Sequence, residues 1–441
     1  MKGFTTGNSY SFLRKVRCFV LGALLSISIL SGCTSSGSNT TSRGTAKEIT
    51  VGAEAGSPYT GFYKSIASEF TTQTGIKVKF LEVPHENMHQ RFITEAAAGT
   101  GAIDVYQVDQ PWISEFAAKG FLDPLDNRIS KDDLADFTSA SLNTVKYQNH
   151  IYGLPYLVHT PIVYYRKDLF QQAGITHPPQ TWNEFRADAK KLTEPNNGIY
   201  GTVVEGKQAP EPVTHLIDMI MQAGGSVLDD QNHVTFDSPQ VLNAFKYMLA
   251  LQYDDHSSPP GAVSYENADV DNLFMQGKVA MAIDWPYLYS LAQDPKQSKV
   301  AGKFGVALQP GDVQNTSSVW SWGYGISSSS KNKDAAWEFV KWATSSSVVK
   351  RFGEKFVNPV ARKSALEAIK ADPKLNKDDL QSIALMSDAA ARGKNAITTP
   401  KFPQIQDRLT ITLSAIMSRQ GNPENVVKTT AADLQNILSN S

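Results

Sequence analysis

Cysteine is almost absent from this chain of 441 residues, which contains only Cys18 and Cys33. Both lie near the N-terminus, so a disulfide framework is excluded for the rest of the chain. Its stability must therefore come from hydrophobic cores. Basic clusters are lacking as well, and the formal net charge is −1. This charge balance argues against nucleic acid or an anionic membrane surface as a partner.

Long apolar runs are also missing. The apolar stretch from Cys18 to Leu30 is shorter than the roughly 20 residues that a transmembrane helix needs. The residues before it include four basic ones, which are Lys2, Arg14, Lys15 and Arg17. A short apolar run behind basic residues predicts a secretion signal and not a membrane span.

The apolar run ends in Leu30, Ser31, Gly32 and Cys33, which resembles the lipobox of bacterial lipoproteins. We expect a signal peptide over residues 1–32, and a lipidated Cys33 that begins a flexible polar tether over 33–47. Two or three acyl chains, palmitate among them, would hold the protein outside the cytoplasm, at the cell surface or in the periplasm. An ordinary signal peptide with an unmodified cysteine is the alternative.

Several catalytic motifs are absent from the sequence. It has no G-x-S-x-G motif, and the Gly-Lys pairs at 206, 277, 302 and 393 are never followed by Ser or Thr, so no Walker-type phosphate loop is present. His85 to His89 spell H-E-x-x-H, a zinc-hydrolase pattern. However, Pro84 puts His85 in the first helical turn or before it, and no glycine-spaced third histidine follows. We expect no metal, no cofactor and no catalytic residue.

The rest of the chain alternates between strand-like and helix-like patterns. Strands are predicted over Ile49–Glu54, Ile76–Val83 and Ile103–Val108, with helices at 60–73 and 86–98 between them. This alternation predicts a parallel sheet covered by helices. The residues after the tether exceed the ~250–300 that one hydrophobic core accommodates, so two domains are expected.

Helix start signals recur further along the chain. Thr181 with Glu184 forms a capping-box pattern, and Ser238 and Asn422 each precede a proline, as an N-cap residue does. Three other segments have helical patterns, and these are residues 210–223, 331–345 and 402–418.

Six segments together resemble the family 1 extracellular solute-binding proteins, the sugar-binding lipoproteins of bacterial ABC importers. They occur in the family's order over almost all of the mature chain. The segments are IDVYQVDQPWISEFAAKGFLDPLD (103–126), IYGLPYLVHTPIVYYRKDLFQQAGI (151–175), PPQTWNEF (178–185), MQAGGSVLDD (221–230), FMQGKVAMAIDWPY (274–287) and SWGYGISSSSKNKDAAWEFVKWAT (321–344).

The resemblance implies a two-domain clamp of the periplasmic-binding-protein type, each domain an α/β lobe with a mostly parallel sheet. By analogy, three crossovers near 157–161, 309–316 and 357–362 join the lobes, and ligand binds in the cleft between them. The N-terminal lobe would then comprise 48–157 plus 312–358. The C-terminal lobe would comprise 158–311 plus 359–441.

The resemblance also implies partners. The ligand would be a sugar, oligosaccharide or polyol, delivered to ABC permease subunits that work with a separate ATPase. The protein would be a monomer that touches the membrane only through its lipid anchor. A secreted glycoside hydrolase is the alternative function, because two carboxylates facing each other across a cleft are not excluded by the sequence.

Polar site candidates follow the predicted strands. Ligands of open α/β sheets bind beyond the carboxyl ends of the strands. Glu54 follows the first predicted strand, and Asp109 and Gln110 follow the third. In the family, the acid after DVYQV commonly contacts ligand. A solvated loop acid is the alternative for Glu54.

Aromatic rings can stack on the C–H faces of a sugar ring. The resemblance places such stacking residues at Trp285 and Trp322. Trp182, Trp337 and Trp342 lie in helical patterns and are predicted to pack in the core. The full set of aromatic ligand candidates is Trp112, Tyr156, Trp285, Trp320 and Trp322.

One departure from the family is visible after the GLPY segment. Many relatives carry an aspartate and a small residue where this chain has His159 and Thr160. A histidine still donates or accepts a hydrogen bond, so His159 is kept as a ligand candidate. Arg362, behind the NPV turn, is interpreted as a surface charge, with a contact at the cleft rim as the alternative.

Overall fold

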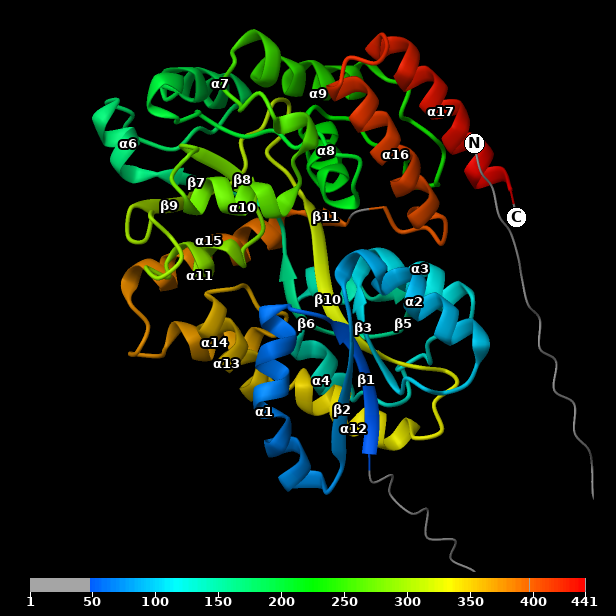
Figure 1. Ribbon diagram of the computed structural model, residues 1–441. Helices are drawn as coiled ribbons and strands as arrows, with labels where there is room; N and C mark the ends of the chain where they lie inside the picture. The colour runs from blue at the N-terminus through cyan, green and yellow to red at the C-terminus, as the bar shows by residue number, and fades with distance from the viewer. Residues whose placement is uncertain (1–47, 396, 441) are drawn as a thin grey trace, which may run out of the picture. The chain divides into compact units, whose positions relative to one another are not determined.

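The computed structural model describes residues 48–395 and 397–440. These residues form an α/β structure in which strands and helices alternate from the start, as the sequence predicts (Figure 1). The expected signal peptide, Cys33 and the tether lie outside the described residues. Within the described part of the chain, no helix is long and apolar enough to cross a membrane.

The larger of two main sheets has six strands in the order β11-β10-β3-β1-β2, with β6 also paired to β10. Strand β1 is parallel to β2 and β3, whereas β10 is antiparallel to β3 and β6 and parallel to β11. The strands are β1 (Glu48–Glu54), β2 (Lys77–Val83), β3 (Val105–Asp109), β6 (Leu154–His159), β10 (Ser318–Ile326) and β11 (Lys394–Asn395). This sheet is the structural basis of the site.

Close approach of β10 to β6 depends on a glycine. The register between the two strands shifts between Trp322 and Gly323. A Cβ atom at Gly323 would lie only 2.7 Å from the carbonyl oxygen of Leu154. Any larger residue at this position would push β10 away from β6.

The smaller sheet has the order β8-β7-β9, and both of its pairings are antiparallel. The expectation of a mostly parallel sheet in each domain is therefore wrong for this sheet. Alternation of strands and helices does not fix strand direction, which depends on the end at which the chain enters a sheet. The remaining strands are β4 (Lys146–Tyr147), β5 (His150–Ile151), β7 (Ile162–Arg166), β8 (Met281–Asp284) and β9 (Phe304–Ala307), of which β4 and β5 form a short hairpin.

The predicted helices and strands agree with the structure to within two residues at each end. The α-helices up to residue 249 are α1 (Pro58–Thr74), α2 (His85–Ala98), α3 (Gln110–Ala118), α4 (Lys131–Asp136), α5 (Ser139–Asn143), α6 (Lys167–Gln172), α7 (Trp182–Lys191), α8 (Pro210–Gln222) and α9 (Pro239–Leu249). The later ones are α10 (Asn267–Met275), α11 (Leu288–Ala292), α12 (Lys333–Ala343), α13 (Ser346–Phe356), α14 (Lys363–Lys370), α15 (Lys377–Arg392), α16 (Phe402–Met417) and α17 (Pro423–Ser439). Short turns of other helix types are η1 (Pro195–Asn197), η2 (Ala250–Asp254, a π-helix) and η3 (Ala262–Ser264).

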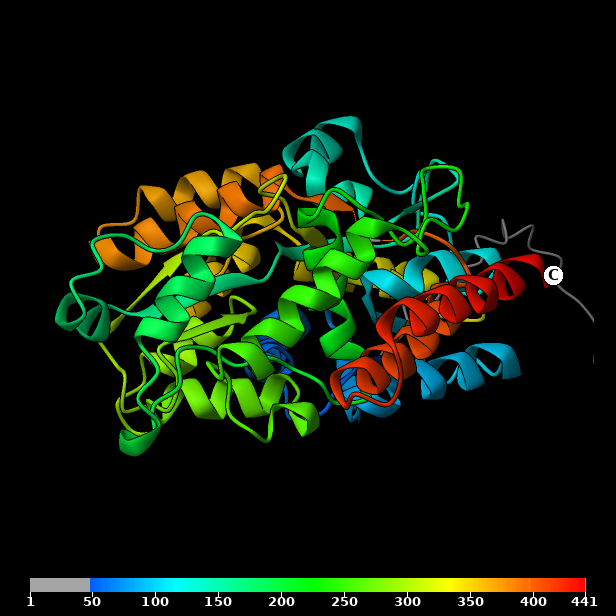
Figure 2. The ribbon, with the colours of Figure 1, turned by 90° about the horizontal axis from the view of Figure 1, so that it is seen from above.

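The predicted N-caps are confirmed. The side chains of Thr181, Ser238 and Asn422 each accept a hydrogen bond from the backbone N–H three residues later, at 3.2, 3.4 and 3.1 Å. These bonds satisfy donors that the first helical turn leaves free. The last two helices, α16 and α17, lie side by side in both views (Figures 1 and 2).

Buried apolar side chains form two large core clusters. The first includes Tyr63, Phe92 and Tyr324 around the large sheet and extends to Tyr164 of the small sheet, and the second includes Phe185 and Phe245. The buried apolar residues thus do not form one single cluster, but the two large clusters do not follow the predicted lobes.

The chain passes twice between the two sheets through short connections. It leaves β6 at His159 and begins β7 at Ile162, and it leaves β9 at Ala307 and begins β10 at Ser318. Further on, Ile369 of α14 still packs in the first cluster, whereas Phe402 packs in the second. The lobe boundaries expected at 157/158, 311/312 and 358/359 stay predictions.

Trp182 provides a test of the second core. Its side chain is 5% exposed, stacks on Tyr247 with ring centroids 4.2 Å apart, and donates a hydrogen bond of 2.9 Å to Gln222. We expect Trp182→Ala to lower the free energy of unfolding by about 3–5 kcal/mol, measured by urea denaturation. Trp337→Ala, at a half-buried position, is the control and should cost clearly less. Equal losses in the two variants would contradict this assignment.

Candidate functional site

Acidic side chains end two neighbouring strands of the large sheet. Glu54 is the last residue of β1, and Asp109 is the last residue of β3. Because β1 and β3 are parallel, both carboxylates lie at the same edge of the sheet. Gln110 begins α3 directly afterwards, and its backbone N–H donates a 2.9 Å hydrogen bond to Asp109 Oδ1. The three predicted polar residues are thus neighbours, as expected.

Strand β10 places two of the predicted tryptophans beside predicted polar residues. Trp322 lies opposite Asp109 of β3, and Trp320 lies opposite His159 of β6. Side chains two positions apart in a strand point to the same face, so both indoles project from one side of β10. The register of a single strand therefore brings four candidates together.

One aromatic group forms around Trp322. The rings of Trp112 and Trp322 meet edge to face, with centroids 6.0 Å apart and planes at 81°. The imidazole of His85 lies against both indoles, at 5.7 Å from Trp322 and 6.4 Å from Trp112. Both tryptophans are buried.

A second aromatic group forms around Trp285, which directly follows β8. The Trp285 indole stacks at a tilt on the His159 imidazole, with centroids 4.5 Å apart. It also meets Trp320 nearly edge to face at 6.3 Å. Residues from both sheets thus contribute to this group.

His85 and Glu211 connect the two aromatic groups. His85 Nε2 lies 3.6 Å from Glu211 Oε1, and the other carboxylate oxygen of Glu211 accepts a 3.0 Å hydrogen bond from Trp285 Nε1. His85 Nδ1 lies 3.6 Å from Glu54 Oε1. Sequence reasoning missed both residues as ligand candidates. His85 lies just after the end of β2, much as Glu54 and Asp109 lie at the ends of β1 and β3. The rule that ligands bind beyond the carboxyl ends of strands could therefore have identified His85. No sequence signal marks Glu211.

The pKa values of two acidic side chains of the site, Asp109 and Glu54, are raised. Burial is the largest cause that raises the pKa of Asp109, to about 8, and the carboxylates of Glu211 and Glu54 add to it against the opposing effect of His85. Burial also raises the pKa of Glu54. Burial alone would lower the pKa of His85, but Glu211, Glu54 and Asp109 together raise it. Burial lowers the pKa of His159 to about 3, so this imidazole is neutral.

Several buried polar atoms at the site have no hydrogen-bond partner among the described residues. They are Nδ1 of His85, Oε1 of Gln110 and Nδ1 of His159. The 3.6 Å separation of His85 Nδ1 from Glu54 is an ion-pair distance and too long for a hydrogen bond. Unsatisfied buried polar atoms are costly, and their grouping here provides donors and acceptors for a polar ligand.

Comparison with known proteins identifies the family. Residues 54–350 match the bacterial extracellular solute-binding protein family. The chain belongs to this family. A binding protein of Brucella abortus is 30% identical over 434 residues, which cover 96% of this chain and 99% of that one. The mannitol-binding protein of Pseudomonas aeruginosa is 29% identical over 78% of this chain and 82% of its own length.

Solved structures of similar proteins confirm the expected clamp fold. A maltose-bound protein of Thermotoga maritima superposes with a TM-score of 0.81 at 27% identity, covering 88% of this chain and 99% of that one. A solute-binding protein of Agrobacterium radiobacter in complex with ribitol superposes with a TM-score of 0.80 at 26% identity, covering 89% and 99%. This solute-binding protein therefore has the two-domain fold of periplasmic binding proteins, and its family acts outside the cytoplasm.

A hydrogen-bond network fixes both sheet-to-sheet connections of the solute-binding protein. Buried Asp218 accepts hydrogen bonds of 2.6 Å from the backbone N–H of Ser318 and from Gln309 Nε2. Gln309 also donates to the carbonyl of Pro161 at 2.9 Å, and Trp320 donates to Ser318 Oγ at 2.6 Å. The hydrogen bond to Ser318 therefore connects Trp320 to the segments through which the chain passes between the sheets.

Tyr156 lies apart from the other site candidates. It is fully buried in the first core, and its ring contacts those of Tyr63 and Tyr324. Its hydroxyl accepts a 2.9 Å hydrogen bond from Gln107, which in turn accepts one from the backbone N–H of Glu54. Tyr156 thus reaches the site only through Gln107, and its role as a ligand contact stays a prediction.

Arg362 is not the surface charge that the sequence suggested. Its side chain is 4% exposed, pairs with Asp133 at 2.5 Å and with Asp136 at 3.1 Å, and lies over the ring of Phe137. These partners come from α4 and the residue after it, more than 200 residues earlier in the sequence. The sequence near Arg362 therefore does not reveal that its charge is buried and paired. Arg362 links the α13–α14 region to α4.

The two histidines of the H-E-x-x-H motif have different partners. His85 lies between Glu54 and Glu211, whereas His89 Nε2 lies 2.6 Å from Glu115 Oε2. Among residues 48–395 and 397–440, no group of three or more His, Cys, Asp or Glu side chains is arranged to hold a metal ion. The expectation that the protein binds no zinc stays a prediction.

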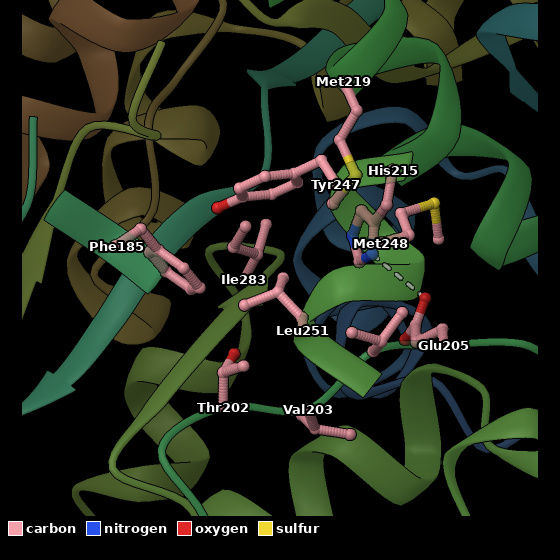
Figure 3. Close-up of a pocket in the computed structure, with 11 residues that line it drawn as sticks. Phe185, Thr202, Val203, Glu205, His215, Met219, Tyr247, Met248, Leu251 and Ile283 are labelled. Carbon is pink, nitrogen blue, oxygen red and sulfur yellow. Dashed lines mark ion pairs between the residues drawn. The ribbon is translucent and has the colours of Figure 1, made fainter. Parts of the chain in front are cut away.

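A small cavity lies between α8, α9 and β8, apart from the predicted ligand residues (Figure 3). Its volume is about 20 Å³, which admits a water molecule but not a sugar. Glu205 and His215 form an ion pair of 3.0 Å at its wall, where the figure draws a dashed line. Phe185, Met219 and Tyr247 provide apolar surface around them. This cavity is not the ligand site.

The raised pKa of Asp109 gives a testable dependence of stability on pH. Between about pH 4 and pH 8 the folded state retains a proton that the unfolded chain loses, so the free energy of unfolding falls as pH rises. Asp109→Asn removes the titrating group and keeps a good N-cap residue. We expect it to gain on the order of 1 kcal/mol or more over wild type near the top of this window, and nothing near its bottom.

Urea denaturation of both proteins across this pH range measures the effect. Asp230→Asn, at an exposed position, is the matched control and should track wild type throughout. A gain for Asp109→Asn that does not change with pH would contradict the buried carboxyl.

Proposed function

We propose that this protein captures a sugar, an oligosaccharide or a polyol in the site between the two aromatic groups and delivers it to an ABC importer. The observation that carries the proposal is the combination of four buried tryptophans with carboxylates and unpartnered polar atoms. Relatives and structural neighbours are described as binding mannitol, maltose and ribitol. The shared property of these ligands is a neutral carbon skeleton covered with hydroxyls.

The chemistry of the site suits such a ligand. Trp112 and Trp322 on one side, and Trp285 and Trp320 on the other, offer flat apolar surfaces for C–H groups. Asp109 is expected to be largely protonated at neutral pH, because burial raises its pKa to about 8, so its hydroxyl can donate a hydrogen bond. Gln110 Oε1 and His159 Nδ1 are further unpartnered groups, and we leave Tyr156 out of the proposed site.

Delivery requires other proteins. We propose that the ligand passes to permease subunits in the membrane and that a separate ATPase supplies the energy, with this chain acting as a monomer. No Walker-type loop is present in the sequence, in agreement with this division of labour.

We further propose that the protein releases its ligand unchanged. A secreted glycoside hydrolase is the alternative, since the site contains carboxylates. Incubation of the protein with maltose and other disaccharides, followed by chromatography of the sugars, distinguishes the two. Appearance of monosaccharides at a rate that depends on Asp109 would establish hydrolysis.

A thermal-shift screen of the protein without residues 1–33 tests the ligand class. The panel contains sugars, disaccharides and linear polyols, with mannitol, ribitol and maltose among them. A ligand present at about 100 times its Kd adds about 2.7 kcal/mol to the free energy of unfolding, which produces a measurable rise in Tm. A panel without any shift would contradict the proposal.

Trp322 should be a major contributor to ligand affinity. Truncation removes the aromatic surface that we assign to a ligand face, so Trp322→Ala should weaken binding by more than about 2 kcal/mol, roughly 30-fold. Isothermal titration with the best ligand of the screen provides the measurement. Trp337→Ala, whose indole lies on α12, is the matched control and should bind like wild type. If Trp285→Ala and Trp322→Ala both fold and bind like wild type, the proposed site is wrong even if the transport role stands.

We also propose that Cys33 is lipidated and anchors the protein to the membrane. The proposal rests on the lipobox from Leu30 to Cys33 and on the family's location outside the cytoplasm. Cys33→Ser should move the protein from the membrane fraction to the soluble fraction, because no acyl chain can then be attached. Immunoblots of fractionated cells show the outcome. Unchanged retention of the variant in membranes would argue against lipidation at this residue.

A further inference from the structure

His85 occupies a central position in the site, but the proposed function assigns no role to this residue. It is the first residue of α2 and directly follows Pro84, which ends the connection from β2. Its two ring nitrogens face carboxylates on opposite sides, with 3.6 Å from Nδ1 to Glu54 and 3.6 Å from Nε2 to Glu211. His85 therefore lies between two acids that come from different parts of the fold.

These two acids belong to the two halves of the binding site. Glu54 ends β1 of the large sheet, whereas Glu211 lies in the first turn of α8, whose buried residues belong to the second core cluster. Glu211 is tied to Trp285 by the hydrogen bond from the indole N–H. A bridge through His85 thus joins the Trp322 group to the Trp285 group.

The titratable groups around His85 are all carboxyl groups. They are Glu54 from β1, Glu86 from its own helix, Asp109 from the end of β3 and Glu211 from α8. Together they raise the pKa of His85 although burial opposes this, so the imidazolium form is favoured. Without this cation the carboxylates of Glu54 and Glu211 would repel each other, and such repulsion is strong where water is partly excluded.

Free hydrogen-bonding capacity remains on the ring. Nδ1 of His85 is buried and has no hydrogen-bond partner among the described residues, although the side chain as a whole is about one third exposed. A ligand hydroxyl beside Nδ1 and Glu54 would accept a hydrogen bond from the imidazolium and donate one to the carboxylate. The indoles of Trp322 and Trp112 beside the ring would cover the adjacent C–H groups.

We propose that His85 is a ligand-binding and specificity-determining residue, whose imidazolium bridges Glu54 and Glu211 over the ligand and donates a hydrogen bond to a hydroxyl of a neutral sugar or polyol. This proposal rests on the proposed function and adds to it a preference for neutral over charged ligands. A ligand carboxylate is repelled by Glu54 and Glu211. A ligand ammonium competes with the imidazolium for the same two acids.

The sign of the pH dependence follows from the raised pKa of His85. The charged form is present below this pKa and is lost as pH rises through it, so ligand affinity should fall on the alkaline side. Loss of one charge-assisted hydrogen bond corresponds to about tenfold or more in Kd. Glutamine at position 85 still donates a neutral hydrogen bond but does not titrate.

The experiment is isothermal titration of wild type and His85→Gln with D-mannitol and with maltose from about pH 6 to pH 9. We expect wild type to lose about tenfold or more in affinity over this range. His85→Gln should bind about tenfold more weakly at the acid end and lose clearly less than wild type across the range, because Asp109 still titrates there while His85 no longer does. His233→Gln, which removes an exposed histidine paired with Asp229, is the matched control and should follow wild type. The same titration in Asp109→Asn separates the two groups, because the pH dependence of His85 should persist there.

Ligand charge supplies the second comparison. D-glucitol, its 1-amino derivative and D-gluconate differ in the charge of one terminal group. Wild type should reject gluconate in favour of glucitol, and His85→Gln should shift the preference towards the amino derivative, because Glu54 and Glu211 then lack their cation. An unchanged order of preference in His85→Gln would overturn the specificity role.

A measurement without ligand isolates the bridge. Histidine-selective NMR titration gives the pKa of His85, which should fall in Glu211→Gln and stay unchanged in Glu338→Gln, a control on the surface of α12. If mannitol or maltose binds to His85→Gln as tightly as to wild type, the His85 proposal is wrong and the proposed function stands. If no neutral sugar or polyol binds to wild type, the proposed function fails together with the ligand role of His85. An unchanged pKa of His85 in Glu211→Gln would overturn the bridge.

Discussion

The pairing of β10 with β3 on one side and β6 on the other determines which side chains meet in the site. Trp322 lies opposite Asp109 and Trp320 opposite His159 only in the observed register. A slip by one residue would turn both indoles to the other face of the sheet. Gly323 permits the close approach of β6, and the bonds of Ser318 to Asp218 fix the start of the strand. The geometry of the site thus depends on one strand.

The site contains groups that a folding core would avoid. Asp109 is a buried carboxyl whose pKa is raised to about 8, and His159 is a buried imidazole whose pKa is lowered to about 3. Burial of such groups is costly. Such groups reduce stability and are retained where they serve a function. In this protein they lie beside aromatic side chains, and this combination is the basis of the proposed binding site.

The H-E-x-x-H segment shows how the same residues acquire different chemistry in different folds. In a zinc hydrolase both histidines point from one helical face to a metal. Here both imidazoles lie against Trp112, but the acidic neighbours of His85 are Glu54 and Glu211, whereas His89 pairs with Glu115. The acids that surround each histidine, and not the motif itself, decide between the two outcomes.

Local sequence determined much of the structure. Hydrophobic periodicity, prolines and N-cap residues such as Thr181 fixed the helices and the first strands, because each of these effects acts within a few residues. The position of a residue at the end of a strand selected Glu54, Asp109 and Gln110 as ligand candidates, and resemblance to a family selected Trp285 and Trp322. Tertiary structure alone decided that the small sheet is antiparallel, that Arg362 is buried between Asp133 and Asp136, and that His85 meets Glu211. These contacts join residues far apart in the chain, and their energies depend on which elements pack together, which no local pattern encodes.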